Sequence, residues 1–235
     1  AVFPAASERW SFEYLAEHLL PEVPFSVFAS ETGDYAYWYG KPNAAGFAFA
    51  NPTRRQEMTF PQFVRLRGDL EQGRVYLQDP LYYDKGGCRG LRREVMGAAL
   101  LRDWEAGLSW ATLEQVRGAG GLGHLSTSSL FCSGRGAYSR PHYDQTANLH
   151  LQICGAKRWL LFPPEDSPVL YAYPRGHPLD RKSRLDLESP DLASFPEAAA
   201  LEGRGRCAVL LPGDALWLPS HCGTRSSPWN MRRCP

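Results

Sequence analysis

The sequence predicts a mainly β fold with flanking helices, in which short strands form a barrel or sandwich of the jelly-roll type. The second half of the chain contains several short apolar segments of strand character, separated by turns rich in Gly and Pro. The first half also contains segments whose apolar residues recur at helical spacing. With 235 residues, 43% of them hydrophobic, the chain can bury a substantial core, and no linker divides it.

In the first half, residues 7–20 are predicted to form a helix, because a Ser precedes Trp10, Phe12 and Leu15 at roughly helical spacing. Aromatic and β-rich segments on either side of the turn-forming "ETGD" predict a pair of strands. The elements expected in this half after the first helix are strands at 25–30 and 35–40, a helix at 58–70, a strand at 73–78 and a helix at 91–107.

In the second half, strands are expected at 123–133, 147–154, 156–163, 206–214 and 215–220, with a long Pro-rich excursion over 163–205. A barrel built from such strands is open at one end, and its inward-facing positions can hold a metal and a small ligand.

Composition excludes several classes of function. The net charge is +1, so the chain lacks the basic surface expected of a nucleic-acid-binding protein. No apolar run approaches the ~20 residues that cross a bilayer, and the N-terminus lacks the layout of a signal peptide. The six cysteines contain no CxxC pair, which indicates free thiols in a reducing compartment, the cytoplasm or nucleus.

The stretch "SRPHYDQTANLHLQ" contains a candidate metal site. His142 and Asp144 are two residues apart, so on a strand both side chains project to the same side. A second histidine from a distant strand would complete the facial triad of two histidines and one carboxylate that marks non-haem Fe(II) oxygenases. The alternative is a hydrogen-bonded polar pair at a strand end.

A polar face follows this pair. Asn148, His150 and Gln152 alternate with apolar residues, so this face is either exposed to solvent or lines a cavity with polar contents. Lys157 lies on the next predicted strand. It is either an ordinary exposed lysine or the partner of a dicarboxylate co-substrate inside the barrel.

Several ordered motifs resemble those of the JmjC dioxygenases. These are "PHYDQTANLHLQICGAKRWLLFPPED", "YAYPRGHPLDRKS", "DLASFP" and "LLPGDALWLPS", preceded by "RWSFEYL", "RRQEMTFPQFV" and "RVYLQ". Within that family the chain looks most similar to the asparaginyl hydroxylase of hypoxia-inducible factor, factor inhibiting HIF. The resemblance extends to Ser220 and implies a double-stranded β-helix, the cupin-like JmjC barrel, here truncated at its C-terminal end.

The resemblance also implies an activity. Members of this family use Fe(II), 2-oxoglutarate and O2, and hydroxylate a β-carbon while 2-oxoglutarate becomes succinate and CO2. The implied partner is a protein substrate, a transcription factor or an ankyrin-repeat segment, hydroxylated on asparaginyl (or Asp or His) side chains in the cytoplasm or nucleus. The alternative is a catalytically inactive JmjC-fold module that binds protein partners.

Site residues follow from the same resemblance, position by position. His142 and Asp144 match the first two iron ligands. The positions that match co-substrate-binding residues are Tyr76, Ser139, Asn148 and Lys157, and those that match substrate-binding residues are Gln78 and Arg181. His150 replaces an aromatic residue of the co-substrate pocket, and Lys182 replaces a glutamine that touches the target amide.

The third iron ligand is not in its expected place. The family has Trp-Trp-His after "PGD…P", and here Thr224 stands at the position of that histidine. His221 lies three residues earlier, so either His221 or no residue supplies the ligand. A one-base insertion in a possible coding sequence restores His-Trp-Trp-His, which suggests a shifted reading frame.

We therefore expect one JmjC domain over 1–221 and an out-of-frame or unstructured tail over 222–235. Because the C-terminal helices that form the dimer in this family have no counterpart here, a monomer is expected.

Overall fold

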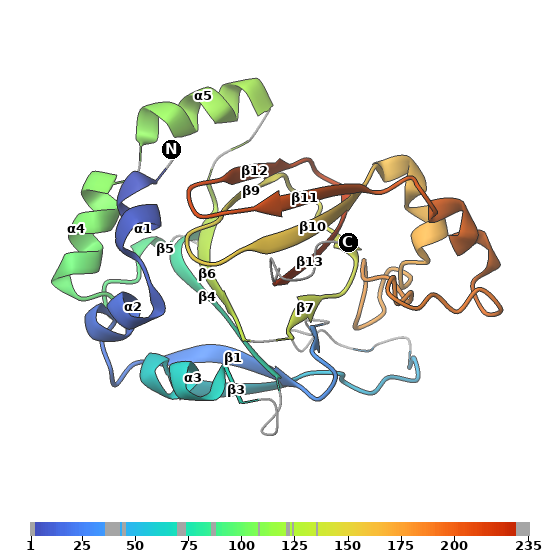
Figure 1. Cartoon of the computed structure of the whole chain (residues 1–235), viewed down its shortest axis with the longest axis horizontal. Coiled ribbons are helices and arrows are strands. Elements are labelled where there is room, and N and C mark those ends of the chain that lie inside the picture. Colours follow the sequence, from blue (N-terminus) through green and yellow to red (C-terminus); the bar gives the residue numbers. More distant parts are fainter. Residues whose placement is uncertain are drawn as a thin grey trace.

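The computed structural model describes residues 3–35, 43, 46–69, 74–85, 88–107, 109–120, 123, 125–134 and 136–228. Within these residues the strands pair into a five-stranded sheet, a four-stranded sheet and two sheets of two strands (Figure 1). The fold is a jelly-roll barrel with helices at its side, as the sequence predicts.

The α-helices are α1 (Pro4–Arg9), α2 (Phe12–His18), α3 (Phe60–Leu66), α4 (Ala98–Gly107) and α5 (Trp110–Gly120), and the 3-10 helices are η1 (Pro164–Asp166), η2 (Pro168–Leu170) and η3 (Pro196–Leu201). The strands are β1 (Pro24–Ser30), β2 (Asp34–Tyr35), β3 (Arg54–Thr59), β4 (Arg74–Lys85), β5 (Cys88–Leu91), β6 (Thr127–Ser133), β7 (Tyr138–Ser139), β8 (His142–Tyr143), β9 (Asn148–Leu151), β10 (Lys157–Phe162), β11 (Arg206–Leu210), β12 (Ala215–Leu218) and β13 (Gly223–Pro228).

The largest core lies between the five-stranded sheet and the helices. The strands of this sheet follow the order β3-β1-β4-β5, and β6 also pairs with β4. Alternation along the strands turns Val27, Leu77 and Cys132 toward this core. Helices α1, α2 and α4 gather on one side of the barrel (Figure 1).

The four-stranded sheet, in the order β11-β10-β13-β8, divides the barrel interior from an outer layer. Lys157, Trp159 and Leu161 of β10 lie on its inner face, where Trp159 packs with Leu210 and Leu218. The two-stranded sheet β12-β9 adds Leu216 and Leu218 to the same interior.

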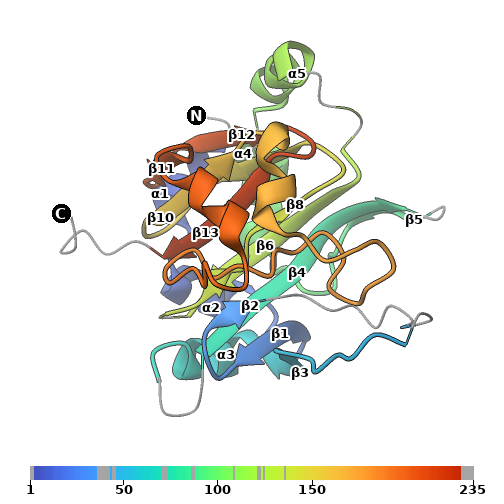
Figure 2. The same ribbon diagram turned by 90° about the vertical axis from the view of Figure 1, so that its right-hand side faces the viewer.

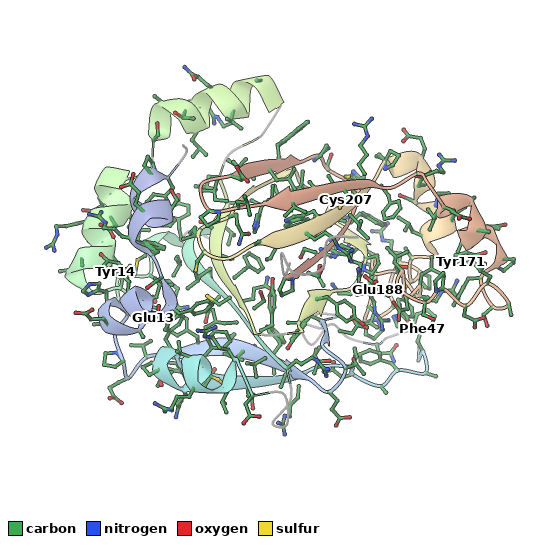
Figure 3. All side chains as sticks on the ribbon, viewed as in Figure 1. Glu13, Tyr14, Phe47, Tyr171, Glu188 and Cys207 are labelled. Atoms are coloured by element: carbon green, nitrogen blue, oxygen red, sulfur yellow. The ribbon has the colours of Figure 1, made fainter. Side chains whose placement is uncertain are left out.

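The outer face of that sheet is covered by the 163–205 segment, which lies in front of the barrel in Figure 2. Phe162 packs there against Leu170 and Leu185. Figure 3 shows Glu188 in this layer, where its carboxylate accepts from Arg158 (2.7 Å) and from Arg225 (2.5 Å).

Strand β13 corrects the prediction of an unstructured tail from Cys222 onward. Gly223–Pro228 pairs antiparallel with β10 along its whole length and with β8 at its start. Most of its residues are buried, and the buried Arg225 forms an ion pair with Glu188. The unstructured alternative is therefore wrong for 223–228. Residues 229–235 lie outside the described residues, and the reading-frame hypothesis stays a prediction.

The predicted helices are present but shorter. The helix expected at 7–20 is two helices, because Ser11 adopts an extended conformation and its hydroxyl caps α2 by accepting from the Tyr14 amide (3.1 Å). The buried Asp103 connects both helices to α4, since its carboxylate accepts from Trp10 and Tyr14 (2.9 Å each).

Two further helices begin later than predicted. The helix expected at 58–70 begins only at Phe60, since β3 continues to Thr59, and the one at 91–107 begins at Ala98. Helix α5 was not predicted.

The strands predicted in the second half are confirmed as β6, β9, β10, β11 and β12, each within its expected range. Of the strand expected at 35–40, Tyr35 lies in β2 and the rest falls outside the described residues. The four cysteines whose side chains are described, Cys132, Cys154, Cys207 and Cys222, are free thiols, as predicted. No helix in the described ranges combines the length and apolarity needed to span a membrane.

Candidate metal and co-substrate site

His142 and Asp144 lie at the end of the barrel where β8 stops. His142 Nδ1 donates to the Arg140 carbonyl (2.8 Å), which leaves Nε2 as the nitrogen with a lone pair for a ligand bond. Burial, then the positive charge of Lys182, lower the pKa of His142, while the Asp144 carboxylate opposes this shift. Asp144 Oδ2 accepts from Asn148 (2.8 Å). A neutral imidazole and a carboxylate are suitable metal donors.

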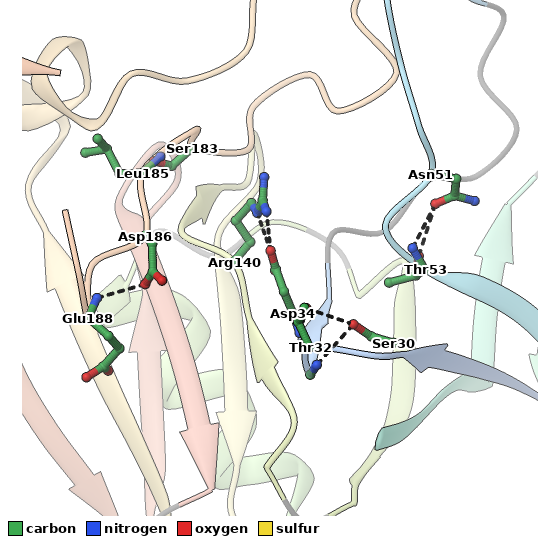
Figure 4. A network of polar contacts seen from close by, with 11 residues as sticks. Ser30, Thr32, Asp34, Asn51, Thr53, Arg140, Ser183, Leu185, Asp186 and Glu188 are labelled. Carbon is green, nitrogen blue, oxygen red and sulfur yellow. Dashed lines mark hydrogen bonds and ion pairs between the residues drawn. The ribbon is translucent and has the colours of Figure 1, made fainter. Parts of the chain in front are cut away.

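An ion pair fixes the chain just before His142. Arg140 Nε donates to the buried Asp34 of β2 (2.7 Å), as Figure 4 shows. The Ser30 hydroxyl accepts from the Gly33 amide and the Thr32 hydroxyl accepts from the Asp34 amide, and these bonds stabilise the short strand. Because the Arg140 carbonyl accepts the hydrogen bond from His142 Nδ1, this ion pair helps to set the orientation of the imidazole.

Thr224 occupies the position across from His142. The two residues are paired directly in the β13–β8 ladder, so their side chains lie on the same face. Thr224 is buried, and its hydroxyl donates to the His142 carbonyl (3.4 Å). Within the part of the chain that the structure describes, no three His, Cys, Asp or Glu side chains group to hold a metal.

His221 does not join His142 and Asp144. Its backbone has φ 63°, its amide donates to the Asp144 carbonyl (2.7 Å), and its ring lies 5.8 Å from that of Tyr143. Tyr143 alternates with His142 along β8, so the His221 ring lies against the side chain that points away from the metal ligands. The donor set therefore does not fit a centre with three protein ligands.

Lys157 is buried inside the barrel. Its side chain is 7% exposed, and its Nζ lies 5.9 Å from the ring centroids of both Tyr76 and Trp159. Among the described residues, no hydrogen bond or ion pair to this ammonium is found. Burial lowers the pKa of Lys157 to about 8. An unpaired buried ammonium is costly, so the site fits an anionic ligand such as the carboxylate of 2-oxoglutarate.

Ser139 and Asn148 are held by protein partners. The Ser139 hydroxyl, on β7, accepts from the Ser226 amide (2.9 Å) and lies 3.1 Å from the Ser226 hydroxyl. Asn148 donates to Asp144, which links the co-substrate position to the metal ligand. Of the predicted co-substrate residues, the structure thus brings Tyr76 to Lys157, and Asn148 to Asp144.

His150 shares the interior with Lys157. Its ring packs edge-on against Trp159 (4.9 Å), and its Nε2 lies 3.1 Å from Gln152 Oε1. Burial, followed by the charge of Lys157, lowers the pKa of His150 to about 4. A neutral ring here can fill the space of the aromatic residue that it replaces.

The two predicted substrate residues lie on separate elements. Gln78 is on β4, and its Oε1 is buried without a hydrogen-bond partner among the described residues. Arg181 has φ 68°, and its carbonyl accepts from the Tyr143 amide (3.3 Å). The backbone of the next residue, Lys182, forms an isolated antiparallel β-bridge with His142. Arg181 also helps to line a small hollow with Pro141, His142 and Tyr143, and this hollow does not include Lys157 or Ser139.

Two interior residues were not found from the sequence. Trp159 is 8% exposed, and its Nε1 is buried with no partner in the described ranges. Ser226 is directly opposite Trp159 in the β10–β13 pair. The alternation in "AKRWLLFP" places Trp159 on the same face as Lys157, but the partner of Trp159 across the sheet depends on a pairing between distant segments.

A family model described as "Cupin-like domain" matches residues 3–221. HSPB1-associated protein 1 of Rattus norvegicus is 38% identical over 98 residues, which cover 40% of this chain and 20% of that protein. The tRNA wybutosine-synthesizing protein 5 of Danio rerio is 39% identical over 94 residues, 40% of this chain and 27% of that protein.

Lysine-specific demethylase 8 of Danio rerio is 33% identical over 102 residues, 43% of this chain and 24% of that protein. The chain thus spans about a fifth to a quarter of the length of these curated relatives.

Proposed function

The chain belongs to the cupin-like domain family, in its JmjC type, and on that premise we propose that it is the barrel of a 2-oxoglutarate-dependent protein hydroxylase. The observation that carries this proposal is Lys157, a buried ammonium with two aromatic neighbours and no acidic partner among the described residues. Its place on the same sheet as His142 supports a co-substrate that reaches from Lys157 toward the metal ligands.

Each site residue would have a distinct role in binding the co-substrate or the metal. Lys157 would bind the distal carboxylate of 2-oxoglutarate, with Tyr76 as a wall of the pocket. His142 and Asp144 would supply two ligands to Fe(II), and Asn148 would orient the Asp144 carboxylate through their 2.8 Å bond. Fe(II), 2-oxoglutarate and O2 together supply the oxidising chemistry when bound.

The proposed target is an asparaginyl side chain, or an Asp or His side chain, in a regulatory or ankyrin-repeat protein. Support comes from the resemblance to the asparaginyl hydroxylase of hypoxia-inducible factor and from Gln78 Oε1, a buried acceptor without a partner in the described residues that suits a target amide N–H. Lys182 can only donate, so it would favour target groups with an acceptor.

A second function is favoured by Thr224. Because this hydroxyl stands where a third imidazole would complete the iron site, the chain could act as a protein-binding module without turnover. The test is 2-oxoglutarate turnover with Fe(II), followed as succinate, with His142→Ala as the control for metal-dependent turnover. Succinate formed above that control supports the hydroxylase. Binding of 2-oxoglutarate without succinate formation supports the binding module. If 2-oxoglutarate does not bind at all, the Lys157 pocket is not a co-substrate site.

A further inference from the structure

Two neutral hydrogen-bond donors lie beside Lys157 on the inner face of the sheet. Trp159 follows Lys157 by two residues on β10, so both side chains point into the barrel. Ser226 lies opposite Trp159 on β13, which makes it a diagonal neighbour of Lys157, at about 7–8 Å between such positions. The positions match none of the site residues predicted from the sequence.

Trp159 carries an unsatisfied donor. The residue is 8% exposed, and Nε1 is buried with no acceptor among the described residues. Indole N–H is a donor only, and leaving it unpaired in the interior costs free energy. A ligand acceptor in the barrel would remove this cost, and the ammonium of Lys157 selects an anionic one.

The Ser226 hydroxyl can accept a hydrogen bond from Ser139 and still have its own proton available for donation. The Ser226 amide lies beyond the two paired residues of the β13–β8 ladder, Gly223 and Thr224, and donates to Ser139 Oγ (2.9 Å). The Ser139 proton can go to Ser226 Oγ at 3.1 Å, a shorter path than to the Ser226 carbonyl at 3.4 Å. The Ser226 hydroxyl is then free to donate to a ligand.

We propose that Trp159 Nε1 and the Ser226 hydroxyl both donate to the carboxylate bound by Lys157, with Ser139 as the residue that positions Ser226. This inference rests on the proposed function, because it takes the ligand to be 2-oxoglutarate. In this arrangement one carboxylate accepts from the Lys157 ammonium and from two neutral donors. The buried ammonium and the buried Trp159 N–H would then both have a hydrogen-bond partner. It also changes the role expected of Ser139, from direct ligand contact to support of Ser226.

The experiment is calorimetric titration of the full chain with 2-oxoglutarate in the presence of Mn(II), which replaces the oxidisable Fe(II). Trp159→Phe keeps the ring that packs on His150 but removes the N–H, and Ser226→Ala removes the hydroxyl. Matched controls are Ser227→Ala, whose side chain lies on the opposite face of β13, and Trp217→Phe, a tryptophan that is 41% exposed on β12. Melting curves establish that each variant is folded.

Trp159→Phe and Ser226→Ala should each raise the Kd for 2-oxoglutarate by about tenfold, as expected for a lost bond to a charged group. The two control variants should bind like the wild type. Adding Ser139→Ala to Ser226→Ala should weaken binding no further, because Ser139 acts through Ser226. Wild-type affinity in either Trp159→Phe or Ser226→Ala overturns the inference while leaving the Lys157 pocket intact. Failure of the wild type to bind 2-oxoglutarate contradicts the proposed function itself.

Discussion

Thr224 lies directly across the β8–β13 pair from His142, with its hydroxyl bonded to the His142 carbonyl. Directly opposed side chains have Cβ atoms about 4.5–5.5 Å apart, so a side chain at 224 is within reach of an ion on His142. The structure thus puts residue 224 on the correct face for a third ligand while the residue itself is a weak donor.

Thr224→His should therefore tighten metal binding. An imidazole at this position would complete a set of two histidines and one carboxylate with Asp144. We expect the affinity for Mn(II) or Fe(II) to rise by at least about tenfold, since even changes in the partners of metal ligands alter affinity by that much. Metal titration followed by electron paramagnetic resonance measures it. Ser227→His is the control, and equal affinity in both variants would count against the placement of residue 224.

His221→Asn should leave metal binding unchanged. The ring of His221 lies against Tyr143 rather than beside His142, and Asn tolerates the positive φ of 63° better than Ala does. The same titration tests it. Loss of metal binding in this variant would make His221 the third ligand, contrary to the arrangement described.

Strand β13 should be required for folding. A chain that stops after Cys222 loses the strand between β10 and β8 and leaves both without a partner on that side. A chain that stops after Pro228 keeps it. We expect the shorter chain to melt at a clearly lower temperature or to aggregate, and the longer one to match the full chain, as measured by circular dichroism. Equal melting of the two would show that β13 contributes nothing.

Binding of 2-oxoglutarate should weaken above pH 8. Burial lowers the pKa of Lys157 to about 8 from 10.5, so the ligand-free amine loses its charge as the pH rises through that value. Binding just above pH 8 should take up a proton, visible as a heat that depends on the ionisation enthalpy of the buffer. Without ligand, stability should rise between about pH 8 and about pH 10.5, because there the unfolded chain still holds the proton that the folded chain has released. Lys157→Met should abolish all three effects.

Local pattern predicted part of this site. His142 and Asp144 were found because alternation on a strand places them on one side, and Lys157 because it begins the next strand. Trp159 and Ser226 were not found, since their proximity depends on the register between segments about 67 residues apart, and no local pattern specifies that register.

The same limit applies to the fold. The "GTRSSP" of β13 has little of the β-branched and aromatic character typical of a strand. It forms a strand because it pairs with β10 on one side and with β8 on the other. The ion pair with Glu188 compensates the buried charge of Arg225, a residue that the sequence alone would place in solvent. The helix expected at 7–20 was divided by Ser11 and Asp103, a cap and a contact from a helix far along the chain.

Calorimetric titration of Lys157→Ala decides whether Lys157 binds a carboxylate of 2-oxoglutarate. Removing the charged pair should cost roughly 1.5–3 kcal/mol, or about ten- to a hundredfold in affinity. Arg158→Ala is the matched control, because the next side chain on β10 points to the outer face and pairs with Glu188. We expect weak or undetectable binding of 2-oxoglutarate in Lys157→Ala and wild-type affinity in Arg158→Ala. Equal affinity of Lys157→Ala and the wild type for 2-oxoglutarate would show that Lys157 does not bind the carboxylate.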